Sequence, residues 1–157
     1  MAHKEKVGVK GELRIRVVNE ETGEVKVDKV IPNLIVDNGL AFITSRMIGT
    51  ADNIIAGMAI GTSNTTPTDA QTALIGESAR VALDAAATRV QTSVSNDTVQ
   101  YIATFPPGTP GSNITVEEAG LFNNASSGGT MLARTLTGTT TKNTTDSLQI
   151  TWKVQIQ

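Results

Sequence analysis

Apolar and polar residues alternate along much of the chain, and this alternation predicts β-strands. Over residues 11–18, aliphatic side chains at every second position are separated by charged ones. The pattern recurs over residues 99–105 and again over 148–156, where it runs without a phase error. A period of two is typical of a strand with one face in the core and one in solvent. These three segments are therefore predicted to be half-buried strands.

A β-hairpin is predicted near the N-terminus. The strand at 11–18 is followed by Asn19–Gly23, a polar segment that ends in glycine and has turn character. Val25 and Val27 resume the alternation, so residues 11–31 are expected to form a charged β-hairpin. Residues 1–10 are expected to be an N-terminal arm, and Pro32-Asn33 is expected to end the second strand.

One short helix is predicted after the hairpin. A short buried run, Leu34–Val36, is followed by Asp37 and Asn38, either of which could cap a helix. Residues 40–48 carry apolar side chains near helical spacing, and Gly49 is placed to end the helix.

The rest of the chain is predicted to be short strands between turns. Thr68 could cap a single helical turn that runs to Ala73. The segments expected to be extended are 54–60, 80–83, 89–94, 113–122 and 131–136, and those expected to be loops are 61–68, 106–111, 123–129 and 138–146. Many short strands with one helix predict an all-β fold, an antiparallel β-sandwich or jelly-roll-like domain over residues 11–157.

Composition narrows the possible functions. The chain has 157 residues, a formal net charge of -2 and no cysteine. Nucleic-acid binding is not expected, because it needs clustered basic charge. No apolar run is long enough to span a membrane, so no membrane partner is expected either. Without cysteine there is no disulfide, thiolate nucleophile or cysteine-based metal site.

Basic residues gather near the N-terminus. The first 30 residues hold seven of the 13 lysines and arginines. They are the candidate contacts to a partner surface: Lys4, Lys6, Lys10, Arg14, Arg16, Lys26 and Lys29.

No catalytic, cofactor-binding or metal-binding residue is assigned. The single histidine, His3, lies near the terminus without an orienting partner. Glu117 and Glu118 are neighbours on a predicted strand, so their side chains point to opposite faces and cannot flank one bond. The glycine-rich segments match no nucleotide-binding motif. The chain is therefore not expected to be an enzyme, and no cofactor is expected.

A few residues receive structural roles. One of the two glutamates is expected to point outward and the other to pair with a cation or to cap backbone amides, and Glu118 with Arg134 on a nearby predicted strand is the candidate pair. The residues expected in the core are Leu121, Phe122, Ile150 and Trp152. Trp152 is in phase with the apolar face of its strand, which favours a core role over a sugar-binding platform.

The segment Ile31–Leu40, with the sequence IPNLIVDNGL, resembles the opening of small virion proteins of tailed bacteriophages. The likeness continues in chain order to residue 157. Its further anchors are 59–63, Pro67, 72–74, 77–80, 118–122, 131–135, Lys142 and 147–152.

This resemblance implies a structural part of a phage particle, on the capsid exterior or in the tail. Because no fibre shaft follows the last core strand, a capsid decoration (cement) protein is expected. The alternative is a tail, baseplate or short tail-fibre protein. The resemblance also implies a homotrimer that binds the major capsid protein in the virion after synthesis in the host cytoplasm. A receptor- or glycan-binding module is a further, less supported reading.

Overall fold

A computed structural model describes residues 7–50 and 52–157 of the chain. It contains one helix and nine strands, and all strand pairings are antiparallel. The strands are β1 (Val9–Asn19), β2 (Val25–Ile35), β3 (Gly57–Gly61), β4 (Glu77–Ala82), β5 (Thr88–Val90), β6 (Thr98–Phe105), β7 (Ile114–Phe122), β8 (Met131–Lys142) and β9 (Asp146–Ile156). The predicted all-β class with a single helix is confirmed for these residues.

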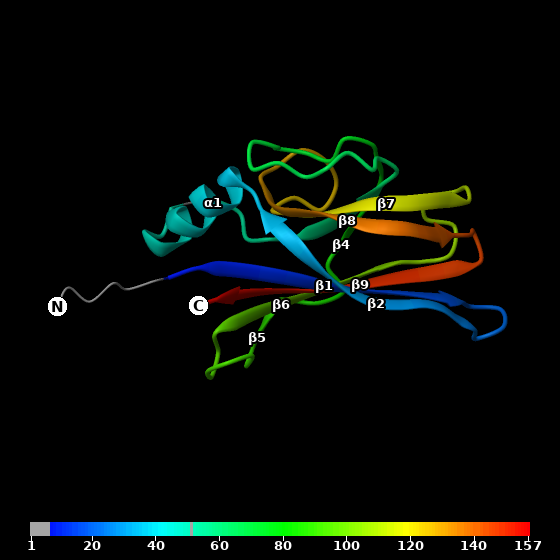
Figure 1. Ribbon diagram of the computed structural model, residues 1–157, viewed down its shortest axis with the longest axis horizontal. Helices are drawn as coiled ribbons and strands as arrows, with labels where there is room; N and C mark the ends of the chain where they lie inside the picture. Colours follow the sequence, from blue (N-terminus) through cyan, green and yellow to red (C-terminus); the bar gives the residue numbers. More distant parts are fainter. Residues whose placement is uncertain (1–6, 51) are drawn as a thin grey trace.

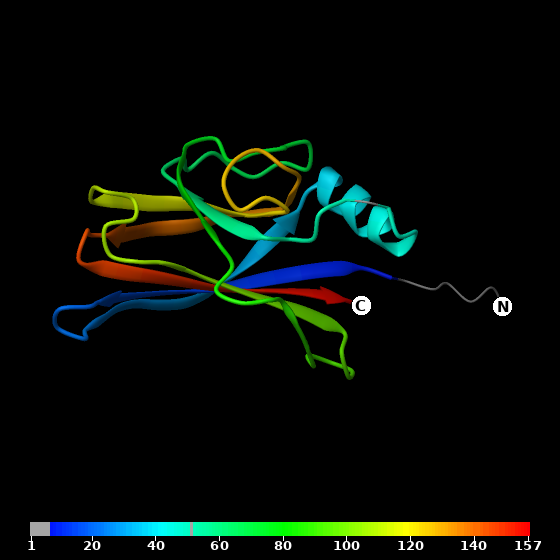
Figure 2. The same ribbon diagram turned by 180° about the vertical axis from the view of Figure 1, so that it is seen from behind.

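The nine strands form one continuous sheet in the order β4-β3-β7-β8-β2-β1-β9-β6-β5. The sheet curls so that β7 and β8 lie across from β1 and β9 (Figures 1 and 2). β2 joins the two layers, since it pairs with β1 along most of its length and with β8 only at Leu34 and Ile35. At the far side, the Asp84 N–H donates to the Ile102 carbonyl of β6 at 2.8 Å, so the chain after β4 reaches the opposite layer. The finer expectation of a sandwich or jelly roll stays a prediction.

The N-terminal hairpin is present as β1 and β2. Residues 1–6 of the predicted arm lie outside the described residues, whereas Val9 and Lys10 belong to β1. The predicted break at Pro32-Asn33 is wrong, because β2 continues to Ile35. Proline is tolerated there because β2 is at that point leaving its pairing with β1 for β8, where few ladder bonds are needed.

Helix α1 (Asp37–Met47) is the single helix of the described residues. It starts earlier than predicted, with Val36 at the cap position and no side-chain cap, so neither Asp37 nor Asn38 caps it. Gly49, at φ 70°, follows its end as predicted. The helix packs closely on β8, because Gly39 lies against the Leu132 carbonyl where a side chain would not fit.

One predicted loop and one predicted helical turn are wrong. Residues 138–146 are mostly strand: β8 runs to Lys142, and Thr137, Thr140 and Lys142 are buried. Threonines at these positions gave no hydrophobic signal, yet their β-branched side chains suit strands. Residues 68–73 form a turn and an irregular loop, and no helical turn.

The core lies between the layers and comes from the inward faces of the strands. Of the four side chains expected in the core, Leu121, Ile150 and Trp152 lie there, while Phe122 is buried in a second, smaller cluster with Leu74 and Met131. Trp152 sits centrally, with Leu13 and Tyr101 as its register partners on β1 and β6. Its indole N–H donates to Oδ1 of Asn33 at 3.0 Å, so the one polar atom of its ring is satisfied.

Candidate functional site

A row of charged side chains covers the outer face of β1. Lys10, Glu12, Arg14 and Arg16 are exposed and alternate with buried residues of the same strand. Neighbouring strands extend the row, since Asp28 of β2 stands opposite Arg16 and Lys153 of β9 stands opposite Glu12. We call this surface the hairpin face, and its six residues are Lys10, Glu12, Arg14, Arg16, Asp28 and Lys153.

One ion pair on this face is already formed. Arg14 donates from Nε and Nη2 to the two carboxylate oxygens of Asp28 at 2.7 and 2.6 Å. These hydrogen bonds hold the pKa of Asp28 below its ordinary value. Among the described residues, the side chains of Lys10 and Arg16 form no hydrogen bond or salt bridge, although the charge of Arg16 also helps to lower the pKa of the facing Asp28.

The hairpin face is hollowed rather than flat. A cavity of about 320 Å³ opens there, lined by Glu12, Arg14, Val30, Gln100, Ile102, Thr151 and Lys153. Its lining mixes charged, amide and aliphatic groups from four strands. Such a hollow suits the side chains of a protein surface better than one defined small molecule.

The seven basic residues proposed for contact do not share one surface. Lys4 and Lys6 lie outside the described residues. Lys29 stands opposite the buried Ile15, so it points to the inner side of the hairpin, with Nζ 3.5 Å from the Gly138 carbonyl. Lys26 lies at a bulge where Val17 pairs with Val27 and Val18 with Val25. The bulge changes the phase of β2, which the sequence alternation did not reveal.

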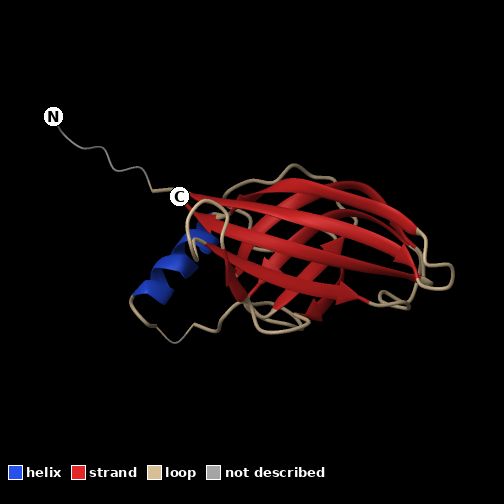
Figure 3. Ribbon diagram, turned by 90° about the horizontal axis from the view of Figure 1, so that it is seen from below, coloured by secondary structure: helices blue, strands red, loops and turns tan. Residues whose placement is uncertain are grey.

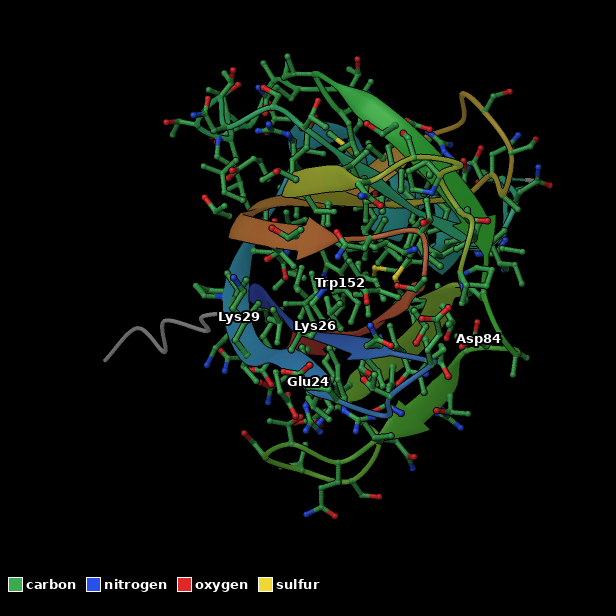
Figure 4. The ribbon with its side chains drawn as sticks, turned by 90° about the vertical axis from the view of Figure 1, so that its right-hand side faces the viewer. Glu24, Lys26, Lys29, Asp84 and Trp152 are labelled. Atoms are coloured by element: carbon green, nitrogen blue, oxygen red, sulfur yellow. The ribbon has the colours of Figure 1, made fainter. Side chains whose placement is uncertain are left out.

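Lys26 instead belongs to a buried cluster of charged side chains at the start of β9. Its Nζ lies 2.6 Å from Oδ2 of the fully buried Asp146 (Figure 4 shows Lys26 and Lys29). Burial alone would raise the pKa of Asp146, yet the hydrogen bonds from Lys26 and from the Asn143 N–H, with the charge of Lys142, hold it below the usual value. This cluster was missed from the sequence, because residues 138–146 were interpreted as a loop.

The predicted pairing of Glu118 with Arg134 is present. Nη2 of Arg134 lies 2.8 Å from Oε2 of Glu118, and both side chains are fully buried between β7 and β8. Arg134 also donates to Oε1 of Gln71 at 3.0 Å and to the Thr65 carbonyl at 2.9 Å. Each ion therefore has several partners, as a buried ion pair requires.

The same pair holds the long loop between β3 and β4. Glu118 accepts hydrogen bonds from the N–H groups of Gly76 at 2.6 Å and Ile75 at 3.2 Å. Gly61 makes room for this carboxylate, because a Cβ there would lie 2.6 Å from Oε1. The two ions themselves are fully buried, whereas Thr65 and Ile75 of the loop are exposed, so the pair attaches a surface loop to the sheet. Gln71 and the loop carbonyl were missed, because they lie in a segment with no periodicity.

Asp97 organises the turn between β5 and β6. Its carboxylate accepts hydrogen bonds from the N–H groups of Thr92, Ser93 and Val94 and from Nε2 of Gln155. Burial works to raise the pKa of Asp97, but these hydrogen bonds outweigh it and lower the pKa well below its usual range. The turn is thus stabilised by an ionised carboxylate.

This lowered pKa predicts acid sensitivity. Below about pH 4 the unfolded chain takes up a proton at residue 97 while the folded chain does not, so the free energy of unfolding falls as pH falls. Asp97→Asn should be less stable than the wild type at pH 7 and should lose less stability between pH 5 and pH 3. Urea unfolding at each pH measures the free energy of unfolding of both proteins, and the values at pH 6 to 7 serve as the reference. If the free energy of unfolding fell equally with pH in the two proteins, the lowered pKa of Asp97 would be contradicted.

The described residues show no arrangement typical of a catalytic centre. Within 7–50 and 52–157, no three His, Cys, Asp or Glu side chains group so as to hold a metal ion. Over the same ranges, no helix has the length and apolar character needed to cross a membrane. Comparisons with protein-family models, curated proteins and solved structures found no significant match to this chain. The surface with the clearest capacity for interaction is the hairpin face.

Proposed function

We propose that this chain is a non-enzymatic structural protein of a tailed-bacteriophage particle that decorates the outside of the expanded capsid. The observation that carries the proposal is the hairpin face, a hollowed, charged sheet surface on which Lys10 and Arg16 have no partner among the described residues. Such a surface is suited to docking on a protein lattice of mixed charge, with the major capsid protein as the partner.

The resemblance to small virion proteins supports the particle assignment. The residues that carry the resemblance hold structural positions in the fold. Glu118 and Arg134 form the buried pair, and the segment 31–40 covers the end of β2 and the start of α1. These positions maintain the fold and its long loop. They favour a virion protein in general, whereas the preference for the head rests on the hairpin face.

The proposed mechanism is clamping. A protein that binds only the expanded lattice stabilises that lattice by mass action, because its binding free energy is added to one state alone. A homotrimer would strengthen the effect, since each bound subunit raises the effective concentration of the others. In this proposal the protein is made in the host cytoplasm and resides on the capsid exterior, and no catalytic residue or cofactor takes part.

The first test is location and copy number. Purified particles separated into heads and tails should carry this chain in the head fraction at a ratio near one per major capsid protein. A low ratio confined to tails would overturn the decoration role and favour the tail, baseplate or short-fibre alternative.

The second test removes the two unpartnered cations of the hairpin face. Lys10→Gln/Arg16→Gln should weaken binding to expanded shells that lack this chain by about five- to thirtyfold, because two surface ion pairs contribute up to roughly 1 kcal/mol each. Co-sedimentation with such shells measures the affinity. The control, Asn64→Glu/Thr66→Glu, changes the net charge equally but at an exposed loop far along the chain. Equal losses in both variants would contradict a specific role for the hairpin face.

A further inference from the structure

One end of the molecule carries a cluster of uncovered apolar side chains. Both described chain ends and helix α1 lie at this end (Figures 1 and 3). The chain ends are joined there, since the N–H groups of Gly8 and Gln157 donate to each other's carbonyls at 2.7 and 2.8 Å. The large apolar side chains exposed on these segments are Val7, Leu40, Met47, Ile48, Ile54 and Ile156. We call this surface the end face.

Helix α1 leaves most of its apolar stripe uncovered. Sequence spacing placed Leu40, Ile43, Met47 and Ile48 along the helix, and such a stripe normally packs on a core. The structure buries only Gly39 and Phe42 of the helix, while Met47 and Ile48 are each 79% exposed. Gly39 fastens the first turn to β8, and the later turns project from the end of the sheet (Figure 3).

A cleft opens beside this projecting helix. It has a volume of about 690 Å³ and runs between α1 and the ends of β6 and β9. Its lining is Phe42, Ile43, Arg46, Met47, Arg89, Val99, Tyr101, Leu132, Val154 and Ile156. The cleft therefore exposes the end of the hydrophobic core, and its two charged lining residues are both arginines.

We infer that the end face is the surface through which copies of this chain associate, with α1 of one copy seated in the cleft of another. The face supplies both halves of such a contact, a convex apolar helix end and a concave apolar cleft beside it. Charge also agrees, because Asp52 is exposed just beyond the helix end, where Arg46 of the same chain donates to its carbonyl at 2.8 Å, while Arg89 lines the far side of the cleft. The inference deepens the proposed function, on whose self-association it rests.

The size of the end face is sufficient for a stable contact. Burying a large aliphatic side chain removes roughly 60 to 120 Å² of apolar surface from water. Because the six side chains are only 45 to 79% exposed, together they would contribute about 250 to 450 Å² per copy. A stable interface buries about 800 Å² per partner, of which somewhat more than half is apolar, so the end face supplies most of the apolar part.

The test is the solution mass of the purified full chain, without capsids. We expect sedimentation equilibrium to show association above the 16.5 kDa of one chain as concentration rises. Met47→Lys/Ile48→Lys should stay at the mass of one chain, because it puts two charges in the proposed contact. These side chains are exposed, and lysine is favourable near a helix C-terminus, so the fold should be kept.

The matched control is Val25→Lys/Ile75→Lys, which places the same charges on exposed apolar residues away from the end face. It should associate as the wild type does. Ile156→Lys, on the opposite side of the cleft, should weaken association independently of the helix. A wild-type chain that keeps the mass of one copy at every concentration would overturn the inference, and so would unchanged association of the helix variant. Neither result would alter capsid binding through the hairpin face, which is measured separately.

Discussion

Arg134→Met should lower the free energy of unfolding by about 3 to 5 kcal/mol, the usual cost of removing one partner from a buried ion pair. The substitution leaves the Glu118 carboxylate fully buried without its cation. It also removes the donors to Gln71 and to the Thr65 carbonyl, so the loop between β3 and β4 loses its attachment to β8. Urea unfolding followed by circular dichroism gives the free energy.

The double variant Glu118→Gln/Arg134→Met separates charge burial from loop attachment. Glutamine at 118 carries no charge and still accepts a hydrogen bond from the Gly76 N–H. The double variant should therefore be more stable than Arg134→Met alone, and the double-mutant cycle should give a coupling of about 1 to 3 kcal/mol. If Arg134→Met lowered the free energy of unfolding by less than about 1 kcal/mol, the ion pair would not be what attaches the loop to β8.

Trp152→Ala should cost about 3 to 5 kcal/mol, as expected when a large core side chain is truncated. Trp152 is fully buried between the layers, among side chains of β1 and β6 (Figure 4). Because strands on both sides hold its neighbours, the core cannot collapse easily into the space that the indole leaves. Chemical denaturation followed by circular dichroism measures the loss.

Trp152→Phe provides the control. Phenylalanine keeps most of the apolar volume but cannot donate to Asn33, whose Oδ1 would lose its partner. The expected loss is about 1 to 3 kcal/mol, the cost of an unsatisfied buried acceptor, which is smaller than for alanine. If both variants lost equal stability, the hydrogen bond and not the packing would dominate this position.

The strands with strict alternation were predictable, and so was the hairpin. In β1 and β9 each second residue enters the core, so hydrophobicity alone defines the face. β8 was predicted too short because Thr137 and Thr140 occupy interior positions that sequence patterns assign to solvent. Buried threonines are acceptable there because their hydroxyls have partners, as in the Thr137 bond to the Val116 carbonyl.

Charged clusters were predictable only in part. Glu118 and Arg134 lie on strands that are consecutive in the chain and adjacent in the sheet, so their pairing followed from the order of the strands. The contacts of Lys26 with Asp146 join residues 120 positions apart and depend on a bulge that carries no sequence signature. The hairpin face therefore holds fewer of the predicted contact residues than the clustering of basic residues near the N-terminus indicated.

The position of β9 in the sheet has a consequence for synthesis. β9 is the last strand of the described residues, yet it lies between β1, the first of them, and β6. Until residues 146–156 have left the ribosome, β1 and β6 have no partner on their facing edges, and Leu13 and Tyr101 lack Trp152 between them. The growing chain therefore exposes an unpaired, apolar sheet edge until β9 has been made. The sheet can therefore be completed only once residues 146–156 have been made, at the slow rate typical of long-range β-pairing.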